Sequence, residues 1–104
     1  MYSRPKFQIG QVVYHRLFGY RGVIIDIDPI FMLSKEWYEQ MARSNPPKDQ
    51  PWYHILVHNA NHKTYVSELN LSVDLSKKQI YHPLLGRYFS TFIDGRYYES
   101  TKID

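Results

Sequence analysis

The chain has 104 residues, of which 43% are hydrophobic and 22% charged, and these values match one ordinary globular domain. It has no cysteine, which excludes a disulfide framework, a thiolate zinc site and a cysteine nucleophile. Its longest apolar run, Ile30 to Leu33, is too short to span a bilayer, and no signal-peptide core follows the first residues. We therefore expect one cytoplasmic domain over residues 1–104.

The charge is mildly basic but unevenly distributed. Thirteen Lys and Arg against ten Asp and Glu give a net charge of +3. Four cations, Arg4, Lys6, Arg16 and Arg21, precede the first acid, Asp26. This pattern is compatible with a local positive field for an anionic partner, and equally with four solvated surface charges.

Two strands joined by a short turn are predicted near the start of the chain. Residues 11–16 and 20–28 are rich in β-branched and aromatic side chains. Gly22 within the second strand predicts a bulge or a sharp bend there. Strand alternation places one set of side chains on a common face: Arg21, Val23, Ile25 and Ile27.

The middle of the chain predicts a short helix and then a hairpin. Ser34 is a suitable N-cap for a helix over residues 34–43, in which Trp37 and Met41 share a face with Tyr38 close by. Three prolines make residues 44–51 a loop. Residues 52–58 and 63–67 predict a hairpin, and residues 68–73 a turn and a short strand.

The last part predicts a helical turn over residues 84–89 and a final strand over residues 96–99 after the turn at Asp94-Gly95. About five short strands with one inserted helix favour a mainly β fold. We expect a small, partly open SH3-like barrel, because closure removes most of the exposed strand edges.

Most of residues 7–73 resemble a known family. Its pattern is carried by the runs Phe7-Gln8-Ile9-Gly10-Gln11-Val12-Val13-Tyr14-His15, Phe18-Gly19-Tyr20-Arg21-Gly22-Val23-Ile24, Asp28-Pro29, Pro51-Trp52-Tyr53-His54-Ile55-Leu56-Val57, Thr64-Tyr65-Val66-Ser67-Glu68 and Asn70-Leu71. These runs resemble the YccV-like, or hemimethylated-DNA-binding, domains. The resemblance implies an SH3-like barrel and a DNA-binding function.

The family includes the bacterial heat-shock protein HspQ, a C-terminal domain of some F-box proteins and a plastid Clp-protease adaptor. The resemblance therefore also implies a stress-response or protease-adaptor role. Residues 82–89 look more like the tail of the F-box-associated version than that of HspQ. We expect residues 82–99 to form a C-terminal extension of the barrel.

The titratable residues give no sign of catalysis. His54, His58 and His62 recur at every fourth position, but on a strand the first two lie about 13 Å apart, so we predict no metal site. We expect His54 to be packed and hydrogen-bonded and the other two to be exposed. Asp26 and Asp28 share a strand face, but no cleft is evident for acid–base work. We predict a non-enzymatic protein without a cofactor.

The best binding segment is the turn over residues 15–21. Arginines at a loop tip can contact phosphates or base edges, and a tyrosine can stack on a base. The predicted DNA-binding residues are His15, Arg16, Tyr20, Arg21, Arg4 and Lys6. The alternative is that Phe18 and Tyr20 plug the end of the barrel while the arginines are solvated.

A second hypothesis is a protein-interaction adaptor that delivers substrates to an ATP-dependent protease of the Lon or Clp type. Its contact residues would be Trp37, Tyr38, Met41 and Trp52, together with the proline-rich loop and an exposed sheet edge. An exposed sheet edge is also compatible with a homo-oligomer. A third hypothesis, a peptide reader with an aromatic cage, requires three or more rings that converge on an exposed site.

Overall fold

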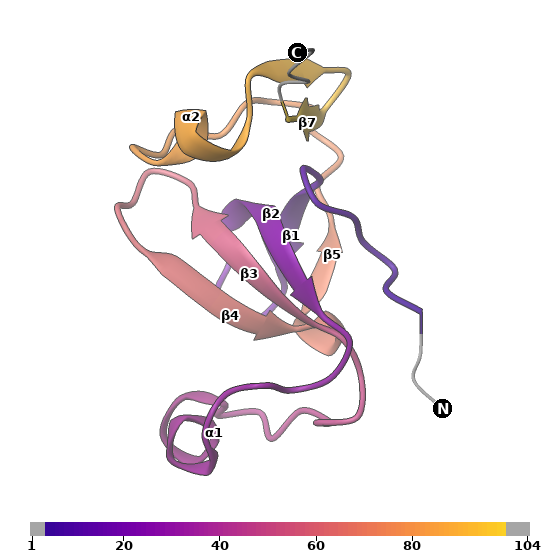
Figure 1. The fold of residues 1–104 in the computed structure, drawn as a ribbon, viewed down its shortest axis with the longest axis vertical. Coiled ribbons are helices and arrows are strands. Elements are labelled where there is room, and N and C mark those ends of the chain that lie inside the picture. The colour runs from indigo at the N-terminus through magenta and orange to yellow at the C-terminus, as the bar shows by residue number, and fades with distance from the viewer. Residues whose placement is uncertain (1–3, 100–104) are drawn as a thin grey trace, which may run out of the picture.

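The computed structural model describes residues 4–99 (Figure 1). The elements in chain order are β1 (Val12–His15), β2 (Arg21–Asp28), α1 (Lys35–Met41), β3 (Trp52–Val57), β4 (Lys63–Ser67), the 3-10 helix η1 (Glu68–Asn70), β5 (Leu71–Val73), α2 (Leu85–Tyr88), β6 (Thr91–Ile93) and β7 (Arg96–Tyr98). Five strands form an antiparallel sheet in the order β4-β3-β2-β1-β5, and β6 and β7 form a separate hairpin. The sheet is curved but keeps β4 and β5 as edges, which confirms a mainly β, partly open domain. Within residues 4–99, no helix is long and apolar enough to cross a membrane.

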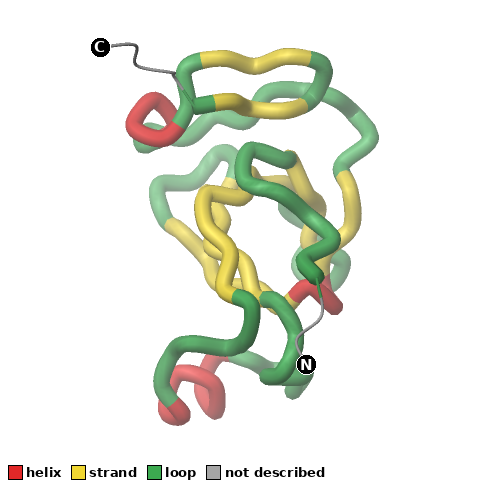
Figure 2. Tube along the Cα trace, turned by 45° about the vertical axis from the view of Figure 1, so that its right-hand side comes forward, coloured by secondary structure: helices red, strands yellow, loops and turns green. Residues whose placement is uncertain are grey.

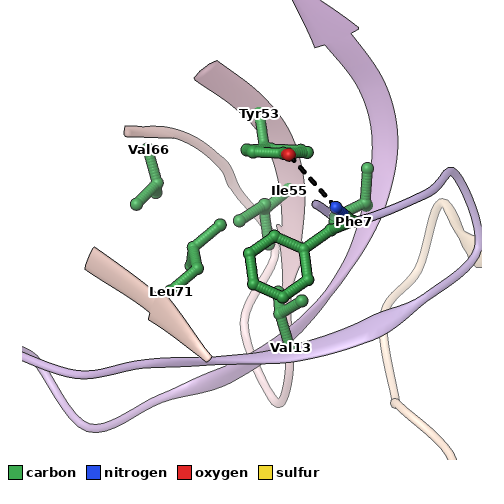
Figure 3. Packing of buried hydrophobic residues seen from close by; sticks show 7 residues of the cluster. Phe7, Val13, Tyr53, Ile55, Val66 and Leu71 are labelled. Carbon is green, nitrogen blue, oxygen red and sulfur yellow. Dashed lines mark hydrogen bonds between the residues drawn. The ribbon is translucent and has the colours of Figure 1, made fainter. Parts of the chain in front are cut away.

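Both faces of the sheet are covered. One face, in the interior of the curved sheet, holds a cluster that includes Phe7, Tyr53 and Ile55 (Figure 3). The other face carries a second cluster, in which Val23 and Leu56 pack against Ile80 and other residues of the C-terminal segment. Because apolar area is removed from water on both sides, β3 is apolar at every position except His54.

The predicted bulge lies at Ile25 and not at Gly22. The β2–β3 register shifts between Ile24 and Asp26, so the side-chain alternation changes there. As a result Ile27 packs against the same interior cluster as Ile24, and its predicted place on the face of Val23 is wrong. Gly22 serves close packing instead: a Cβ at this position would collide with the Ile55 side chain and lie 2.7 Å from the Leu56 carbonyl oxygen.

Helix α1 belongs to an insertion between β2 and β3 that projects from the end of the molecule opposite β6 and β7 (Figure 1). Ser34 caps the helix as predicted, since its hydroxyl accepts the Trp37 N–H at 3.0 Å. Aromatic rings fasten the insertion to the sheet: the Phe31 ring meets Trp52 edge to face at 5.0 Å, and Trp37 meets Tyr65 at 5.5 Å.

Candidate nucleic-acid interface

The turn between β1 and β2 is held in shape by a buried histidine. We call residues 16–19 the tip loop. The His15 Nδ1 atom accepts the N–H groups of Leu17 at 3.2 Å and Phe18 at 3.1 Å, and the His15 ring stacks on Phe18 at 4.6 Å. Burial lowers the pKa of His15, so the ring is neutral at pH 7 and carries its proton on Nε2. His15 is therefore a support for the tip loop and not a cation of the surface.

The tip loop presents one cation and two apolar side chains to solvent. Arg16 is exposed, Leu17 is 58% exposed and Phe18 is 65% exposed. Tyr20, which follows the loop, is half-buried and shares a hydrogen bond of 2.8 Å with the Thr64 hydroxyl. Burial is also the main cause that raises the pKa of Tyr20. The alternative in which both rings plug the barrel end thus applies to Tyr20 but not to Phe18.

Three separate segments that carry exposed cations meet at η1. The Lys6 N–H donates to Glu68 at 2.7 Å, and the Arg16 guanidinium donates to the Leu69 carbonyl at 3.0 Å. The Asn70 side chain donates to Ser44 at 3.1 Å, which brings the end of the α1 insertion to the same place. Figure 2 shows the first described residues of the N-terminal segment beside this short helix.

We call the four cations carried by these segments the basic rim: Arg4, Lys6, Arg16 and Arg43. All four are exposed, and none forms an ion pair with another residue of the described segment 4–99. Unpaired exposed cations are the groups that can exchange counterions for phosphates. Arg43 was not among the residues predicted from the sequence, and it joins this group because the neighbouring Ser44 contacts Asn70 of η1.

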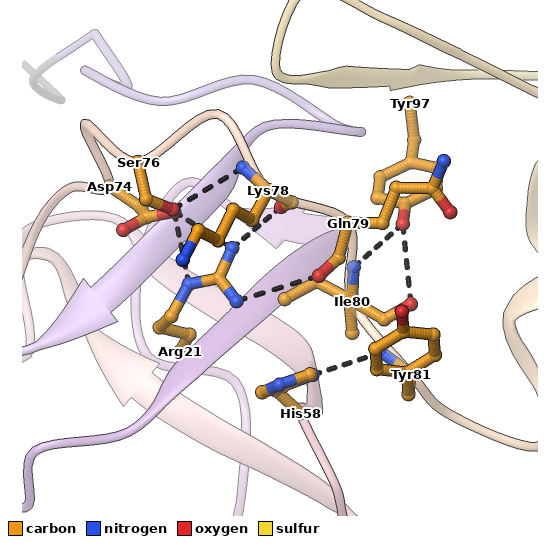
Figure 4. A network of polar contacts seen from close by, with 9 residues as sticks. All are labelled: Arg21, His58, Asp74, Ser76, Lys78, Gln79, Ile80, Tyr81 and Tyr97. Carbon is orange, nitrogen blue, oxygen red and sulfur yellow. Dashed lines mark hydrogen bonds and ion pairs between the residues drawn. The ribbon is translucent and has the colours of Figure 1, made fainter.

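Arg21 has a different role from the cations of the basic rim, because it belongs to a network of polar contacts with the segment after β5 (Figure 4). Its guanidinium donates to Asp74 at 3.0 Å through Nε, with Nη2 2.9 Å from the same oxygen, and to the Lys78 carbonyl at 2.6 Å. Burial would raise the pKa of Asp74, but hydrogen bonds from Ser76 and Arg21 outweigh it and the pKa is lowered. Arg21 therefore holds the segment after β5 against the sheet.

The predicted histidine and aspartate residues form structural contacts. His54 lies 3.2 Å from Asp28, as expected for a packed, hydrogen-bonded residue, and Tyr65 donates to the same carboxylate at 2.7 Å. His58 is half-buried and accepts the Tyr81 N–H at 2.9 Å, so the prediction of an exposed side chain is wrong for this residue. Ligand atoms of Asp26, Asp28 and His54 lie within 4.8 Å of one another, but Asp26 accepts the Ile27 N–H at 2.9 Å, and Asp28 and His54 are bonded to each other across β2 and β3.

A groove of about 420 Å³, which we call the β4 groove, opens beside the tip loop. It is lined by eleven residues of the β1–β2 turn, α1, β3 and β4: His15, Phe18, Tyr20, Trp37, Met41, His54, His62, Lys63, Thr64, Tyr65 and Val66. Of the predicted protein-contact residues, Trp37 and Met41 line it. Trp52 is only 1% exposed, and Tyr38 donates to the Pro46 carbonyl at 2.7 Å, so these two rings hold the insertion in place.

The comparison with known families agrees with the resemblance in the sequence. The family described as "hemimethylated DNA-binding protein YccV like" matches residues 5–96. The chain belongs to the YccV-like family. The match spans the tip loop, the insertion and the C-terminal segment, and it ends at the first residue of β7.

Proposed function

We propose that this YccV-like domain binds duplex DNA in the cytoplasm, without catalysis, through the tip loop and the basic rim. The observation that carries the proposal is that the segments bearing four unpaired, exposed cations meet at η1, beside a loop whose N–H groups are bonded to His15. Phosphate contacts supply affinity and orientation, whereas contacts to base edges supply specificity. Arg4, Lys6 and Arg16 keep their predicted role, Arg43 joins them, and Arg21, His15 and Tyr20 are assigned to support.

A preference for hemimethylated DNA requires an apolar contact for a methyl group in the major groove. Leu17 is the candidate, because it is 58% exposed at the end of the tip loop and directly follows Arg16. In this arrangement Arg16 binds a phosphate or a guanine edge while the Leu17 side chain covers the methyl group. This single contact favours the hemimethylated duplex over the unmethylated one, and discrimination against the fully methylated duplex requires a second group that excludes its other methyl.

The experiment measures fluorescence anisotropy with unmethylated, hemimethylated and fully methylated duplexes at several salt concentrations. Four phosphate contacts predict a slope of log affinity against log salt of about −3.6, and Arg16→Ala lowers its magnitude by about 0.9 for all three duplexes. Leu17→Ala keeps the slope and removes the preference for the hemimethylated duplex. Arg87→Ala, an exposed cation on α2, is the matched control that leaves binding unchanged. Absence of binding at low salt would refute DNA binding, and equal binding of all three duplexes would refute the methyl preference.

A second candidate function is an adaptor that brings substrates to an ATP-dependent protease of the Lon or Clp type. The β4 groove favours it, because the groove is largely apolar and is bordered by Met41, which is 59% exposed, and by Phe18. Degradation of a protease substrate is measured with and without the domain, using Met41→Ala to weaken the groove. Equal degradation rates in the presence and absence of the domain would contradict this function.

A further inference from the structure

We propose that the free edge of β4 binds an extended peptide by strand addition, and that the ligand is an apolar segment flanked by acidic residues. The β4 groove receives the side chains of that segment. The proposal shares with the adaptor function only the premise that this face contacts protein. It names the strand, the backbone atoms and the ligand class, and it requires neither a protease nor DNA.

The backbone of β4 has unpaired hydrogen-bonding groups that face outward. Strand β4 is an edge of the sheet and pairs only with β3. The Val57 N–H donates to the His62 carbonyl at 3.4 Å, and the Glu68 N–H donates to the Pro51 carbonyl at 3.0 Å. In an antiparallel ladder, bonded and non-bonded pairs alternate, so the even-numbered residues of β4 bond to β3.

The N–H and C=O groups of Lys63 and Tyr65 therefore point away from the sheet. Within residues 4–99, no backbone bond joins this edge to another segment. Lys63 and Tyr65 are two positions apart, which is also the spacing of the N–H and C=O groups that an added strand turns toward its neighbour. An extended peptide satisfies all four, whereas a nucleic-acid base has no matching ladder.

The walls of the β4 groove match the alternating side chains of an added strand. Thr64 and Tyr65 are neighbours on β4 and face opposite sides of the sheet. On the Thr64 side the groove is bounded by Phe18 and Tyr20, and on the Tyr65 side by Trp37 and Met41. Successive side chains of the ligand meet one wall and then the other. Because both walls are aromatic or apolar, the central residues of the ligand are apolar.

The polar groups of the groove favour acidic residues beside that apolar segment. None of the eleven lining residues is acidic, whereas Lys63 and His62 are exposed at the β3–β4 turn. The Lys63 ammonium lies 5.7 Å from the centre of the Tyr88 ring, which locates the positive charge at that end of the strand. His15 adds a donor: its Nδ1 atom is occupied, its side chain lines the groove, and its Nε2–H has no partner within residues 4–99. Such a donor fits a carbonyl or carboxylate oxygen of the ligand.

The probe is a fluorescein-labelled peptide, Gly-Glu-Glu-Phe-Leu-Val-Glu-Glu-Gly, added to the ¹⁵N-labelled full chain. Binding is expected to shift the amide resonances of Lys63, Thr64 and Tyr65 and of the Phe18 wall. Two N-methylated peptides keep every side chain and differ in which backbone N–H they lack. Methylation on the edge that pairs with β4 is expected to lower affinity at least tenfold, and methylation on the opposite edge is expected to leave it unchanged.

Protein variants test the same ladder from the other side. Lys63→Pro removes an N–H that faces the free edge and spares the β3 ladder, so tenfold weaker binding is expected. Lys63→Ala is its matched control, because it keeps the backbone N–H and removes only the side-chain charge. Its effect on peptide affinity is therefore expected to be limited to the electrostatic contribution, which high salt also removes. If the proline variant does not fold, the N-methylated pair decides the question with the natural chain.

Other occupants of the groove give distinct results. Equal affinity for both N-methylated peptides, or amide shifts confined to the basic rim, would overturn the proposal. A concentration-dependent dimer that excludes the peptide would assign the edge to a second copy of the chain. If a single-stranded oligonucleotide shifts the amide resonances of the groove and the peptide does not, the groove would be assigned to nucleic acid. Because the duplex titration depends on Arg16 and Leu17, failure of the peptide experiment leaves DNA binding untouched, and the reverse also holds.

Discussion

Two arginines at the ends of the same turn are expected to respond to substitution in opposite ways. Arg16 is exposed and bonded to one carbonyl, whereas Arg21 is bonded to Asp74 and to two carbonyls of the following segment. The sequence placed both in one DNA-binding cluster. The structure separates them, so replacing each by methionine, which retains length and apolar volume, tests which assignment is correct.

The magnitude follows from the exposure of the contacts. The Arg21 side chain is 19% exposed and that of Asp74 is 10% exposed, so solvent screens the pair only partly. A hydrogen bond to a charged group contributes about 1.5–3 kcal/mol, and the bonds of Arg21 act as a unit, so Arg21→Met is expected to lower the free energy of unfolding by about 3 kcal/mol. Arg16→Met removes a single exposed bond and is expected to cost less than about 1 kcal/mol.

The assay is urea unfolding followed by tryptophan fluorescence, together with anisotropy titration of duplex DNA under conditions in which each variant is folded. A domain of this size has about 5–15 kcal/mol of stability, so Arg21→Met remains folded in buffer. It is expected to bind DNA like the natural chain. Arg16→Met is expected to bind DNA more weakly, with a free energy of unfolding close to that of the natural chain. Asp74→Asn keeps an oxygen acceptor and should fall between the natural chain and Arg21→Met in stability. Full stability of Arg21→Met with weakened DNA binding would refute this assignment.

Two further predictions concern packing and pH. Gly22→Ala forces a methyl group against Ile55 and is expected to destabilise the fold by about 1–3 kcal/mol in urea unfolding. Its control, Gly86→Ala, places a Cβ that meets no atom from outside its own helix within 4 Å and is expected to be neutral or stabilising. Equal unfolding midpoints of the two variants would contradict the close packing at Gly22. Because burial lowers the pKa of His15 and of His58 in the folded state, stability is complete above the ordinary pKa of 6.5 and falls as pH drops below it. An NMR titration midpoint of the His15 ring above 6.5 would be incompatible with that burial.

The strands and turns could be predicted because they depend on neighbouring residues. Two strand-forming runs separated by four residues predict the β3–β4 hairpin, and Ser34 predicts the start of α1. The bulge at Ile25 has no comparable local signal, because Val23 and Ile24 are both fully buried and the register of β2 is set by β3. Gly22 misled the prediction since a glycine needed for close packing looks the same in sequence as a glycine needed for a bend.

The candidate site was only partly predictable for the same physical reason. Arg21 and Asp74 are 53 residues apart in sequence, and no periodicity connects them. Likewise Arg43 was assigned to the basic rim from the contact between Ser44 and Asn70, which are 26 residues apart in sequence. Side-chain charge can be read from the sequence, but whether a cation is free or paired depends on contacts that only the folded chain creates.

The tip loop explains how one small domain can carry two binding surfaces. Arg16 belongs to the basic rim, Leu17 beside it is exposed, and the next residue, Phe18, forms a wall of the β4 groove. Both surfaces depend on the same support, since His15 accepts the N–H groups of Leu17 and Phe18 and stacks on the Phe18 ring. As long as these contacts persist when either ligand binds, the loop itself transmits no conformational change between the two surfaces. Any influence of one ligand on the other is then electrostatic: an acidic peptide in the groove weakens the field of Arg16 for phosphate, and salt suppresses that effect.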